Sequence, residues 1–544
     1  MTIQIDRRSI VLGGGFGLAA LLMPGGGALA AGMFGGSGFT HNVASGEPGA
    51  DSMLLWTRFV PATGQGVIRL DVEVALDPDF AKVISGGTTR TGAYRDWTAK
   101  ITVDGLAPGT AYWYRFVGPD GSKSPTGRTK TLPIGNVKRF GLGVFSCSNV
   151  PFGYFNAYAH AAAREDMDLW FHVGDYLYEY HRGGYPSEGQ SVANRLIEPA
   201  REINDLGDYR MRYASYRADP DLQKLHQMKP MVALWDDHES ANDSWEGGAE
   251  NHTPETEGLW NVRRAMAVQA YREWMPVSDE PWKTYDIGTL ATLYRTETRL
   301  LARTQQPDVA PLFREADPTA ALKAFRDGPW MDPSATMMGS TQESWLAHAL
   351  KANARTSAWQ LVGIGTNVGL TSVPANAMDW LTPDADTRAK AFVEAGMAAS
   401  KLGLPMSFDN WGGYPAARAR LLKSAQVADA DLVLLTGDSH NAWAFGLMQD
   451  GKPAGVEFGG HSVTSAGFEG FTKTDPKVVA KGLVDANAEL KWADTSQRGY
   501  MMMEVTPQRV SGDWVFLQTI KTQNLALAGT HRMSVDRGRR AFSA

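Results

Sequence analysis

Cysteine is almost missing from this sequence, whose 544 residues contain a single one, Cys147. One thiol excludes a disulfide within the chain and a zinc site built from several cysteines. The sequence also has no large excess of charge of one sign. It contains 53 basic and 59 acidic residues, and the net charge is -6. This balance gives no electrostatic reason to expect a nucleic-acid partner.

Long apolar runs are missing as well. After the N-terminal segment, no stretch reaches the roughly 18 uninterrupted apolar residues of a membrane span, so we expect no stable span in the mature chain. Hydrophobic residues make up 43% of the sequence and charged residues 21%, as in packed globular proteins rather than disordered ones. The length allows roughly two to four domains at about 150 residues each.

Residues 1–31 are typical of an export signal. The pair Arg7 and Arg8 precedes a run rich in glycine, alanine and leucine, and Ala-Leu-Ala at 28–30 forms a cleavage site of small residues. This pattern resembles a twin-arginine signal, which predicts a twin-arginine export machinery as partner and a periplasmic or secreted protein. An ordinary secretory signal with two incidental arginines is the alternative. Export in the folded state fits a mature chain without disulfides.

Residues 36–132 are rich in strand patterns. Segments 53–58, 67–74 and 111–117 are strand-like, the last two with alternating polarity, and glycine, proline and aspartate separate them. The corner at 106–114 resembles the one before a late strand of fibronectin-type sandwiches. We therefore predict a small all-β sandwich domain over 36–132, without catalytic residues.

From about Phe140 onward, buried-looking strands alternate with helical patterns. Four apolar runs, at 140–145, 169–173, 231–235 and 432–436, each lead directly into polar residues. Alternating strands and helices indicate an α/β core, and open α/β sheets bind ligands at the carboxyl ends of their strands. The pattern predicts one α/β domain over 138–544 that gathers ligands from four distant segments.

The segment Gly-Asp-Tyr-Leu-Tyr at 174–178 follows the second of these runs. Gly174 permits a tight turn close to a ligand. Asp175 is able to bridge two cations, and Tyr178 is able to bind a hard trivalent metal as phenolate, because a strong Lewis acid lowers the pKa of a tyrosine. A capped helix start with a packed tyrosine is the alternative interpretation.

The third and fourth runs also lead into titratable residues. Asp-Asp-His-Glu at 236–239 follows one, with Asn242 just beyond, and Asp438 and His440 follow the other. Four adjacent titratable groups are costly unless water or a metal neutralises them. A solvated acidic loop and an exposed turn are the alternatives. Together, at strand ends of one domain, these clusters favour a metal site.

Cys147 follows the first run, in the sequence Ser-Cys-Ser-Asn. A lone cysteine is most often a small buried hydrophobic residue. A catalytic cysteine requires a partner base, which its sequence neighbours do not supply. A thiolate metal ligand is the third interpretation.

Motifs along the whole mature chain resemble those of the PhoD-type alkaline phosphatase/phosphodiesterase family. They are FSCSN at 145–149, GYFNAY at 153–158, HVGDYLYEY at 172–180, WDDHE at 235–239, DNWGGYP at 409–415, LTGDSH at 435–440 and GYMMMEVT at 499–506, with NVASGEP at 42–48 and WTR at 56–58 in the β-rich front. The resemblance implies an α/β fold, a metallophosphatase-like two-sheet core with flanking helices, preceded by the small all-β sandwich domain.

The resemblance also implies a centre of iron(III) and calcium. Carried over by motif, the metal ligands would be Cys147, Asp175, Tyr178, Asp237, Asn242, Asp438 and His440. Cys147 and Tyr178 would bind iron, and Asp175 would bridge iron and calcium. Asp438 and His440 would complete the metal shell. Either Asp237 or Asn242 would serve calcium.

The function that the resemblance implies is hydrolysis of a phosphate mono- or diester. Metal-activated water would attack phosphorus in line. Asp175 and His238 would be catalytic, with His238 contacting phosphate or donating a proton to the leaving group. Three residues depart from the family pattern. Ser439 stands where many relatives have an aliphatic residue, Glu297 stands where relatives usually have Asp, and His461 lies in a stretch usually rich in serine and threonine.

Other functions fit the same residues. The site would also serve a phosphodiesterase specialised for cell-wall polymers or phospholipids, with residues 180–230 as a lid that selects between esters. A second alternative is a non-catalytic, exported, metal-stabilised binding protein, because the β-rich N-terminal segment resembles adhesive sandwich domains. A hydrolase with Cys147 as nucleophile is a further alternative.

Overall fold

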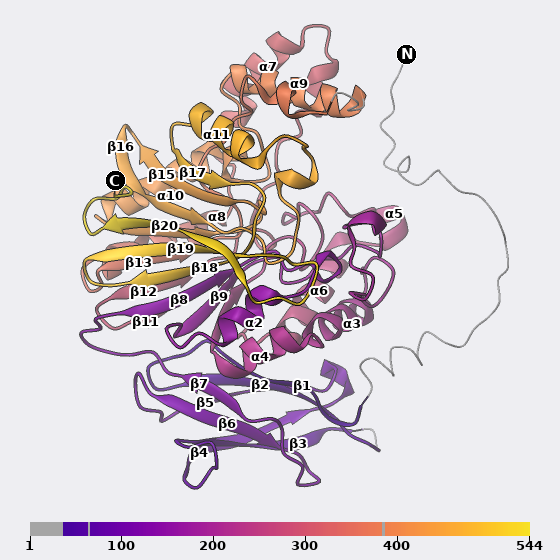
Figure 1. Cartoon of the computed structure of the whole chain (residues 1–544), viewed down its shortest axis with the longest axis vertical. Coiled ribbons are helices and arrows are strands. Elements are labelled where there is room, and N and C mark those ends of the chain that lie inside the picture. Colours follow the sequence, from indigo (N-terminus) through magenta and orange to yellow (C-terminus); the bar gives the residue numbers. More distant parts are fainter. Residues whose placement is uncertain (1–35, 64–65, 383–386, 544) are drawn as a thin grey trace, which may run out of the picture.

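The computed structural model describes residues 36–63, 66–382 and 387–543. The predicted export signal at 1–31 lies outside these residues. Two large sheets pack face to face, and helices cover their outer faces (Figure 1). This arrangement agrees with the predicted two-sheet core with flanking helices. Within the described residues, no helix combines the length and apolar character required to cross a bilayer.

The first sheet has nine strands. Their order is β20 (Leu527–Asp536), β19 (Arg509–Leu517), β18 (Arg498–Val505), β8 (Phe140–Phe145), β9 (Leu169–Val173), β10 (Met231–Leu234), β1 (Gly38–Gly46), β2 (Met53–Val60) and β5 (Thr98–Val103). Strands β8, β9 and β10 run parallel to one another in the middle of the sheet. The loops that follow these three strands therefore meet at one edge.

The second sheet has seven strands. Their order is β11 (Lys283–Ile287), β12 (Ala291–Arg295), β13 (Trp359–Gly363), β14 (Leu432–Thr436), β16 (Lys452–Gly459), β15 (Ala442–Gln449) and β17 (Leu490–Asp494). The central strand β14 is buried on both faces, which explains its continuous apolar sequence. Val433 and Leu435 pack between the two sheets, whereas Leu432 and Leu434 pack under the helices.

Helices form the two outer layers. Those over the nine-stranded sheet are α2 (Asn156–Ala162), α3 (Leu206–Arg217), α4 (Pro220–Met228) and α6 (Trp260–Trp274), and those over the seven-stranded sheet are α8 (Gly339–Asn353), α10 (Pro415–Val427) and α11 (Pro476–Ala486). Helices α7 (Pro318–Asp327) and α9 (Thr387–Lys401) form a small lobe at one end of the molecule (Figure 1). Helix α5 (Pro254–Glu257) is a single turn.

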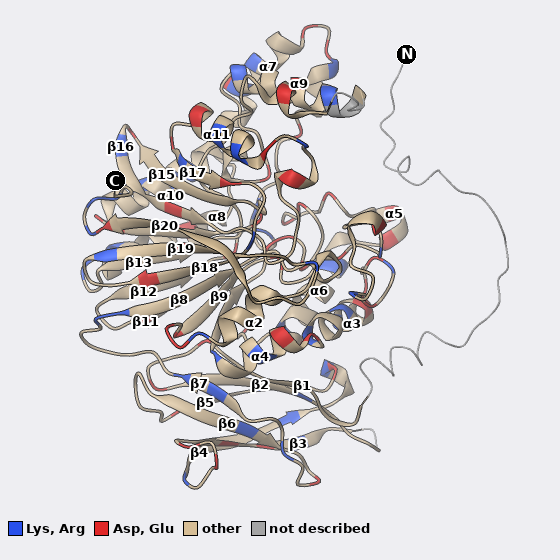
Figure 2. Cartoon of the chain, viewed as in Figure 1, with Lys and Arg blue, Asp and Glu red and all other residues tan. Residues whose placement is uncertain are grey.

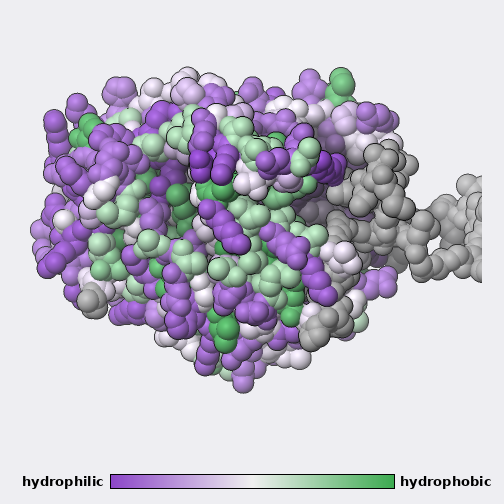
Figure 3. Space-filling model, turned by 90° about the horizontal axis from the view of Figure 1, so that it is seen from above, coloured by the Kyte–Doolittle hydropathy of each residue, from purple (hydrophilic) through white to green (hydrophobic). Residues whose placement is uncertain are grey.

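Short 3₁₀ helices lie in the connections between the helices and strands. They are η1 (Ala93–Arg95), η2 (Val150–Phe152), η3 (Glu188–Gln190), η4 (Ala310–Arg314), η5 (Pro329–Met331), η6 (Ala377–Trp380), η7 (Trp411–Gly413) and η8 (Phe468–Gly470). Basic and acidic residues are interspersed along the ribbon (Figure 2), as expected from the balanced composition. Seen from above, hydrophobic side chains also lie among hydrophilic ones (Figure 3), which is normal for a protein surface.

The N-terminal strands form a sandwich that shares a sheet with the α/β core. A four-stranded sheet of β4 (Val83–Thr91), β3 (Ile68–Ala75), β6 (Ala111–Val117) and β7 (Gly127–Lys130) packs on β1, β2 and β5 through a common apolar core. Strand β1 in turn pairs parallel with β10, at Gly46 and Met231. No local sequence pattern predicts this continuity, because a single pair of residues forms the junction.

The substitution Gly46→Ala tests this junction. An added Cβ would lie 2.0 Å from the carbonyl oxygen of Pro276 and 3.1 Å from that of Met231, and both are backbone atoms. We expect the free energy of unfolding to fall by about 1–3 kcal/mol, as measured by chemical denaturation. Gly66→Ala is the matched control, because nothing lies within 4 Å of its added Cβ. Equal midpoints for the two variants would contradict the close approach.

Candidate metal centre

Four strand ends converge between the two sheets. The amides of Cys147 and Ser148 donate to the carbonyls of Gly174 and Asp175, at 3.1 and 2.8 Å, so the loops after β8 and β9 are joined. Gly174 lies against the loop after β10, where an added Cβ would come within 2.4 Å of Asp236 Cβ. The loop after β14 approaches from the facing sheet, and a Cβ on Gly437 would lie 2.7 Å from the Cβ of Ser146.

The backbone adopts the left-handed conformation at four of the predicted metal ligands. All four have positive φ: Cys147 at 58°, Asp175 at 56°, Asp438 at 66° and His440 at 60°. Non-glycine residues rarely adopt this left-handed conformation, which costs on the order of 1–3 kcal/mol at each position. Such strain persists only where the surrounding structure enforces it, and it gathers at functional sites.

The two predicted iron ligands, Cys147 and Tyr178, lie together with the predicted bridging residue Asp175 and with His440 of the predicted metal shell. The sulfur of Cys147, a carboxylate oxygen of Asp175 and a ring nitrogen of His440 lie within 4.8 Å of one another. The hydroxyl of Tyr178 is 3.3 Å from Asp175 Oδ2 and 3.0 Å from His440 Nε2. It also accepts a hydrogen bond of 2.8 Å from Ser465. Four side chains from three strand ends thus surround one point.

Asp175 also belongs to a second group of potential ligands, with Asp237 and His238. Asp237 Oδ2 accepts a hydrogen bond of 2.7 Å from the amide of Asp243. Asp175 Oδ1 and Asp237 Oδ1 are buried and have no hydrogen-bond partner among the described residues. Buried carboxylate oxygens without a donor are a costly arrangement that a cation would relieve.

The remaining predicted ligands lie at the margins of these two groups. Asp438 is in a third group, with Asp236 and Asp237. The backbone amide of Asn242 donates to Glu179 at 2.8 Å, and its side-chain amide donates to Glu250 at 2.6 Å. The side-chain nitrogen of Asn242 is thus engaged with Glu250.

Burial controls the charge of the site. It raises the pKa of Asp175 well above the usual range, and Asp237 and Asp236 add to the shift. Burial, with Asp236 next, does the same to the pKa of the partly exposed Asp438. Burial also raises the pKa of the Cys147 thiol and lowers the pKa of His440 to about 3. For these four side chains, a neutral imidazole and acids that resist ionisation are the state expected of a metal ligand without its cation.

The donor set fits two cations of different character. A thiol, a phenol, a carboxyl and an imidazole together suit a transition metal such as iron. The carboxyl groups of Asp175 and Asp237 offer bare oxygens, which are the ligands that calcium prefers. Because Asp175 belongs to both groups, its carboxylate is placed to serve two ions at once.

His238 is held by the carboxylate of Glu179, a residue for which the sequence predicted no role. Its Nδ1 lies 2.7 Å from Oε2 of the fully buried Glu179. Glu179 is itself fixed by hydrogen bonds from the amide of Asn242 and the side chain of Asn251. Burial lowers the pKa of His238, but Asp237 and Glu179 outweigh burial and raise the pKa well above 6.5. The imidazole is therefore held protonated, with Nε2 as its other donor.

Glu239 joins two of the ligand loops, a role that sequence reasoning also missed. Its carboxylate accepts from the amides of Asp175 at 3.2 Å, Tyr176 at 2.6 Å and Asp236 at 2.8 Å. The only signal in the sequence was the run of four titratable residues at 236–239. The hydrogen bonds from these three backbone amides explain why the Glu239 carboxylate is stable in a buried position.

Part of the predicted lid lies beside the site. Tyr185 places its hydroxyl 3.3 Å from His440 Nδ1, and the ring of Tyr180 is 5.5 Å from that of His238. Helices α3 and α4, by contrast, pack on the nine-stranded sheet. His461, which the sequence left without a role, is buried against Phe516 with Nε2 3.2 Å from a backbone carbonyl oxygen.

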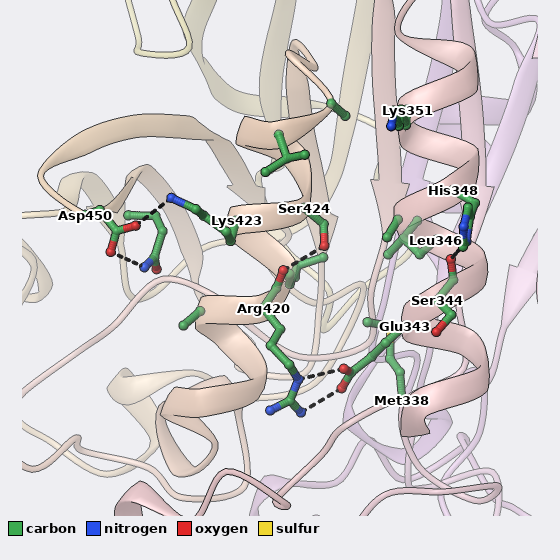
Figure 4. Close-up of a pocket in the computed structure, with 16 residues that line it drawn as sticks. Met338, Glu343, Ser344, Leu346, His348, Lys351, Arg420, Lys423, Ser424 and Asp450 are labelled. Atoms are coloured by element: carbon green, nitrogen blue, oxygen red, sulfur yellow. Dashed lines mark hydrogen bonds and ion pairs between the residues drawn. The ribbon is translucent and has the colours of Figure 1, made fainter.

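A groove of about 670 Å³ between α8 and α10 is a separate feature (Figure 4). None of its lining residues belongs to the three ligand groups. Two ion pairs lie among its lining residues, Arg420 with Glu343 and Lys423 with Asp450. The groove lies on the helical side of the seven-stranded sheet, whereas the ligand loops lie between the sheets.

Comparisons with known proteins agree with the sequence motifs. The family model described as "PhoD-like phosphatase" matches residues 142–514, and that of the "PhoD-like phosphatase, N-terminal domain" matches residues 27–133. Alkaline phosphatase D of Bacillus subtilis (strain 168) is 32% identical over 516 residues, which cover 90% of this chain and 79% of that protein.

Solved structures show the same architecture. A structure described as "Structure of PhoD" has a TM-score of 0.76 and 28% identity, covering 94% of this chain and 92% of the other. The purple acid phosphatase PPD1 from yellow lupin (Lupinus luteus) seeds has a TM-score of 0.54 at 12% identity, covering 91% and 74%. The predicted fold class and the prediction of a phosphoric ester hydrolase are thereby confirmed. The chain belongs to the PhoD-like phosphatase family.

Proposed function

We propose that this chain is an exported, metal-dependent phosphoric ester hydrolase with a centre of iron(III) and calcium. The observation that carries the proposal is the convergence of a thiol, a phenol, an imidazole and two carboxylates around Asp175. The pattern of residues 1–31 supports twin-arginine export to the periplasm or the exterior. A phosphate mono- or diester is the substrate.

Each metal ligand has a separate task in this proposal. Cys147, Tyr178 and His440 would hold iron, and the carboxylate of Asp175 would be shared with calcium. Asp237 and Asp438 would complete the oxygen ligands, with Asn242 at the margin. When bound, the two ions supply Lewis acidity and an activated water for attack on phosphorus.

His238 is the proposed general acid. Glu179 binds its Nδ1, so the ring orientation is fixed and Nε2 is the nitrogen that transfers a proton. The raised pKa keeps the imidazolium protonated until the leaving oxygen develops charge. Glu179 is thus a positioning residue, because it acts on the reaction through His238.

Replacement of His238 tests the proton donor. His238→Ala should lower kcat for a nitrophenyl phosphate ester by roughly 10²–10⁴-fold, the range for loss of a general acid or base. Iron and calcium content should stay at the wild-type level. His348→Ala is the matched control, since His348 is exposed and its Nδ1 lies 2.7 Å from the backbone carbonyl oxygen of Ser344. Unchanged turnover in the His238 variant would remove this residue from the mechanism.

Metal removal should make stability depend on pH. The pKa values of Asp175, Asp438 and Asp243 are raised in the folded protein, that of Asp243 to about 8. These carboxyls therefore bind more protons in the folded state than in the unfolded state, so rising pH destabilises the fold. His440 does not interfere, because with a pKa of about 3 it is neutral in this range.

Thermal unfolding at about pH 7 and about pH 9 measures this effect. The chelated protein should lose stability on going to the higher pH. Protein loaded with iron and calcium should lose less, because cations then balance the ionised carboxylates. The same pH slope in both forms would show that these carboxylates do not face bound cations.

Alkylation separates a metal-ligand role of Cys147 from a nucleophilic one. The thiol is fully buried and its pKa is raised by burial and then by Asp175, the opposite of an activated thiolate. Metal-loaded protein treated with iodoacetamide should therefore keep its activity. Cys147→Ser should lose iron while keeping its fold by circular dichroism. Irreversible inactivation of fully loaded protein would support the cysteine-nucleophile alternative.

A further inference from the structure

Arg299 is a fully buried cation among the carboxylates of the centre. Its Nε and Nη2 bind the two carboxylate oxygens of Asp236 at 2.8 and 2.9 Å, and its Nη1 binds Asp409 at 2.7 Å. The same Nη2 lies 3.8 Å from Asp237 Oδ1 and 3.9 Å from Asp438 Oδ1. One guanidinium nitrogen thus faces all three members of the third ligand group.

The loop that carries Arg299 is built to hold it still. It follows β12, and the carboxylate of Glu297 accepts from the amides of Arg299, Leu300 and Leu301 at 2.8, 2.6 and 3.1 Å. Trp235 donates to the same carboxylate at 2.8 Å. These bonds give Glu297, one of the departures from the family pattern, a structural role: its side chain stabilises the loop and belongs to none of the three ligand groups.

Each of the three guanidinium nitrogens of Arg299 already binds a carboxylate oxygen. The two-pronged contact with Asp236 is the strong geometry between arginine and a carboxylate, and it uses both oxygens of Asp236. A calcium ion takes carboxylate oxygens at about 2.3–2.6 Å and would have to displace the guanidinium to reach them. Asp237 Oδ1, by contrast, has no hydrogen-bond partner among the described residues.

We propose that Arg299 is the internal cation of the third carboxylate group. Asp236 is then its partner and not a metal ligand, and Arg299 is a positioning residue that sets the direction of the Asp237 and Asp438 carboxylates toward the bound metals. A fixed positive charge facing these three carboxylates also repels an additional divalent ion. The inference rests on the proposed function, because it concerns how the chain limits the metals of that centre.

Metal counting at saturating calcium tests the role of Asp236. Asp236→Asn should bind the same number of iron and calcium ions per chain as wild type, as measured by elemental analysis after removal of free metal. Asp237→Asn is the comparison, and it should lose about one calcium ion because this carboxylate is a proposed ligand. Loss of a calcium ion from Asp236→Asn as well would overturn the inference.

Removal of the internal cation tests Arg299 directly. Arg299→Gln leaves Asp236 without its counter-charge and removes the positive charge that faces Asp237 and Asp438, so the variant should bind about one further calcium ion. Calcium should also raise its thermal unfolding temperature more than that of wild type. Arg303→Gln is the matched control, because Arg303 is also buried and binds Asp409 at 2.6 Å. Among the described residues, the carboxylate that pairs with Arg303 is that of Asp409, which belongs to none of the three ligand groups.

The outcomes separate the inference from the proposed function. An equal calcium response in the Arg299 and Arg303 variants, with no gain of calcium, would overturn the role of Arg299. Wild-type protein without iron or calcium would contradict the proposed metal centre, and a calcium ion gained only by Arg299→Gln would still support the inference. If Arg299→Gln does not fold, the metal count of Asp236→Asn decides.

Discussion

Negative charge gathered between two sheets is the constraint on which the rest of this structure depends. Asp175, Asp236 and Asp237 are all buried, and Asp237 offers a carboxylate oxygen within 4.8 Å of Asp175 in one group and of Asp236 and the partly exposed Asp438 in another. Carboxylates in such surroundings are stable only when cations or hydrogen-bond donors face them. Part of this compensation comes from Arg299 and from backbone amides, and the oxygens left without partners on Asp175 and Asp237 are where metal ions fit.

The strands, the loops and the backbone conformation together bring these carboxylates and the other ligands to one place. Parallel strands β8, β9 and β10 bring three loops to one edge, and β14 adds a fourth from the facing sheet. Close approach at Gly174 and Gly437 lets these loops touch. The bent backbones at Cys147, Asp175 and His440 then turn the ligands toward one another. Continuity of the N-terminal sandwich with the same nine-stranded sheet adds a further anchor through β1 and β10.

Sequence patterns predicted the strand ends because apolar runs and the polar residues that follow them are local signals. The same patterns could not reveal partners that are far apart in sequence. Glu179 meets His238 and Arg299 meets Asp236 only after the sheet is assembled. Asp438 and His440, two residues apart, both lie at the site: His440 is grouped with Cys147 and Asp175, and Asp438 is grouped with Asp236 and Asp237. That both bind metal is part of the proposal.

The metal content of the purified, exported protein, with activity before and after chelation, tests the central claim most directly. The account predicts that both iron and calcium are present in active protein. Chelation should abolish hydrolysis of a phosphate ester, and restoring both ions should recover it. Full activity in protein that contains neither ion would contradict the account.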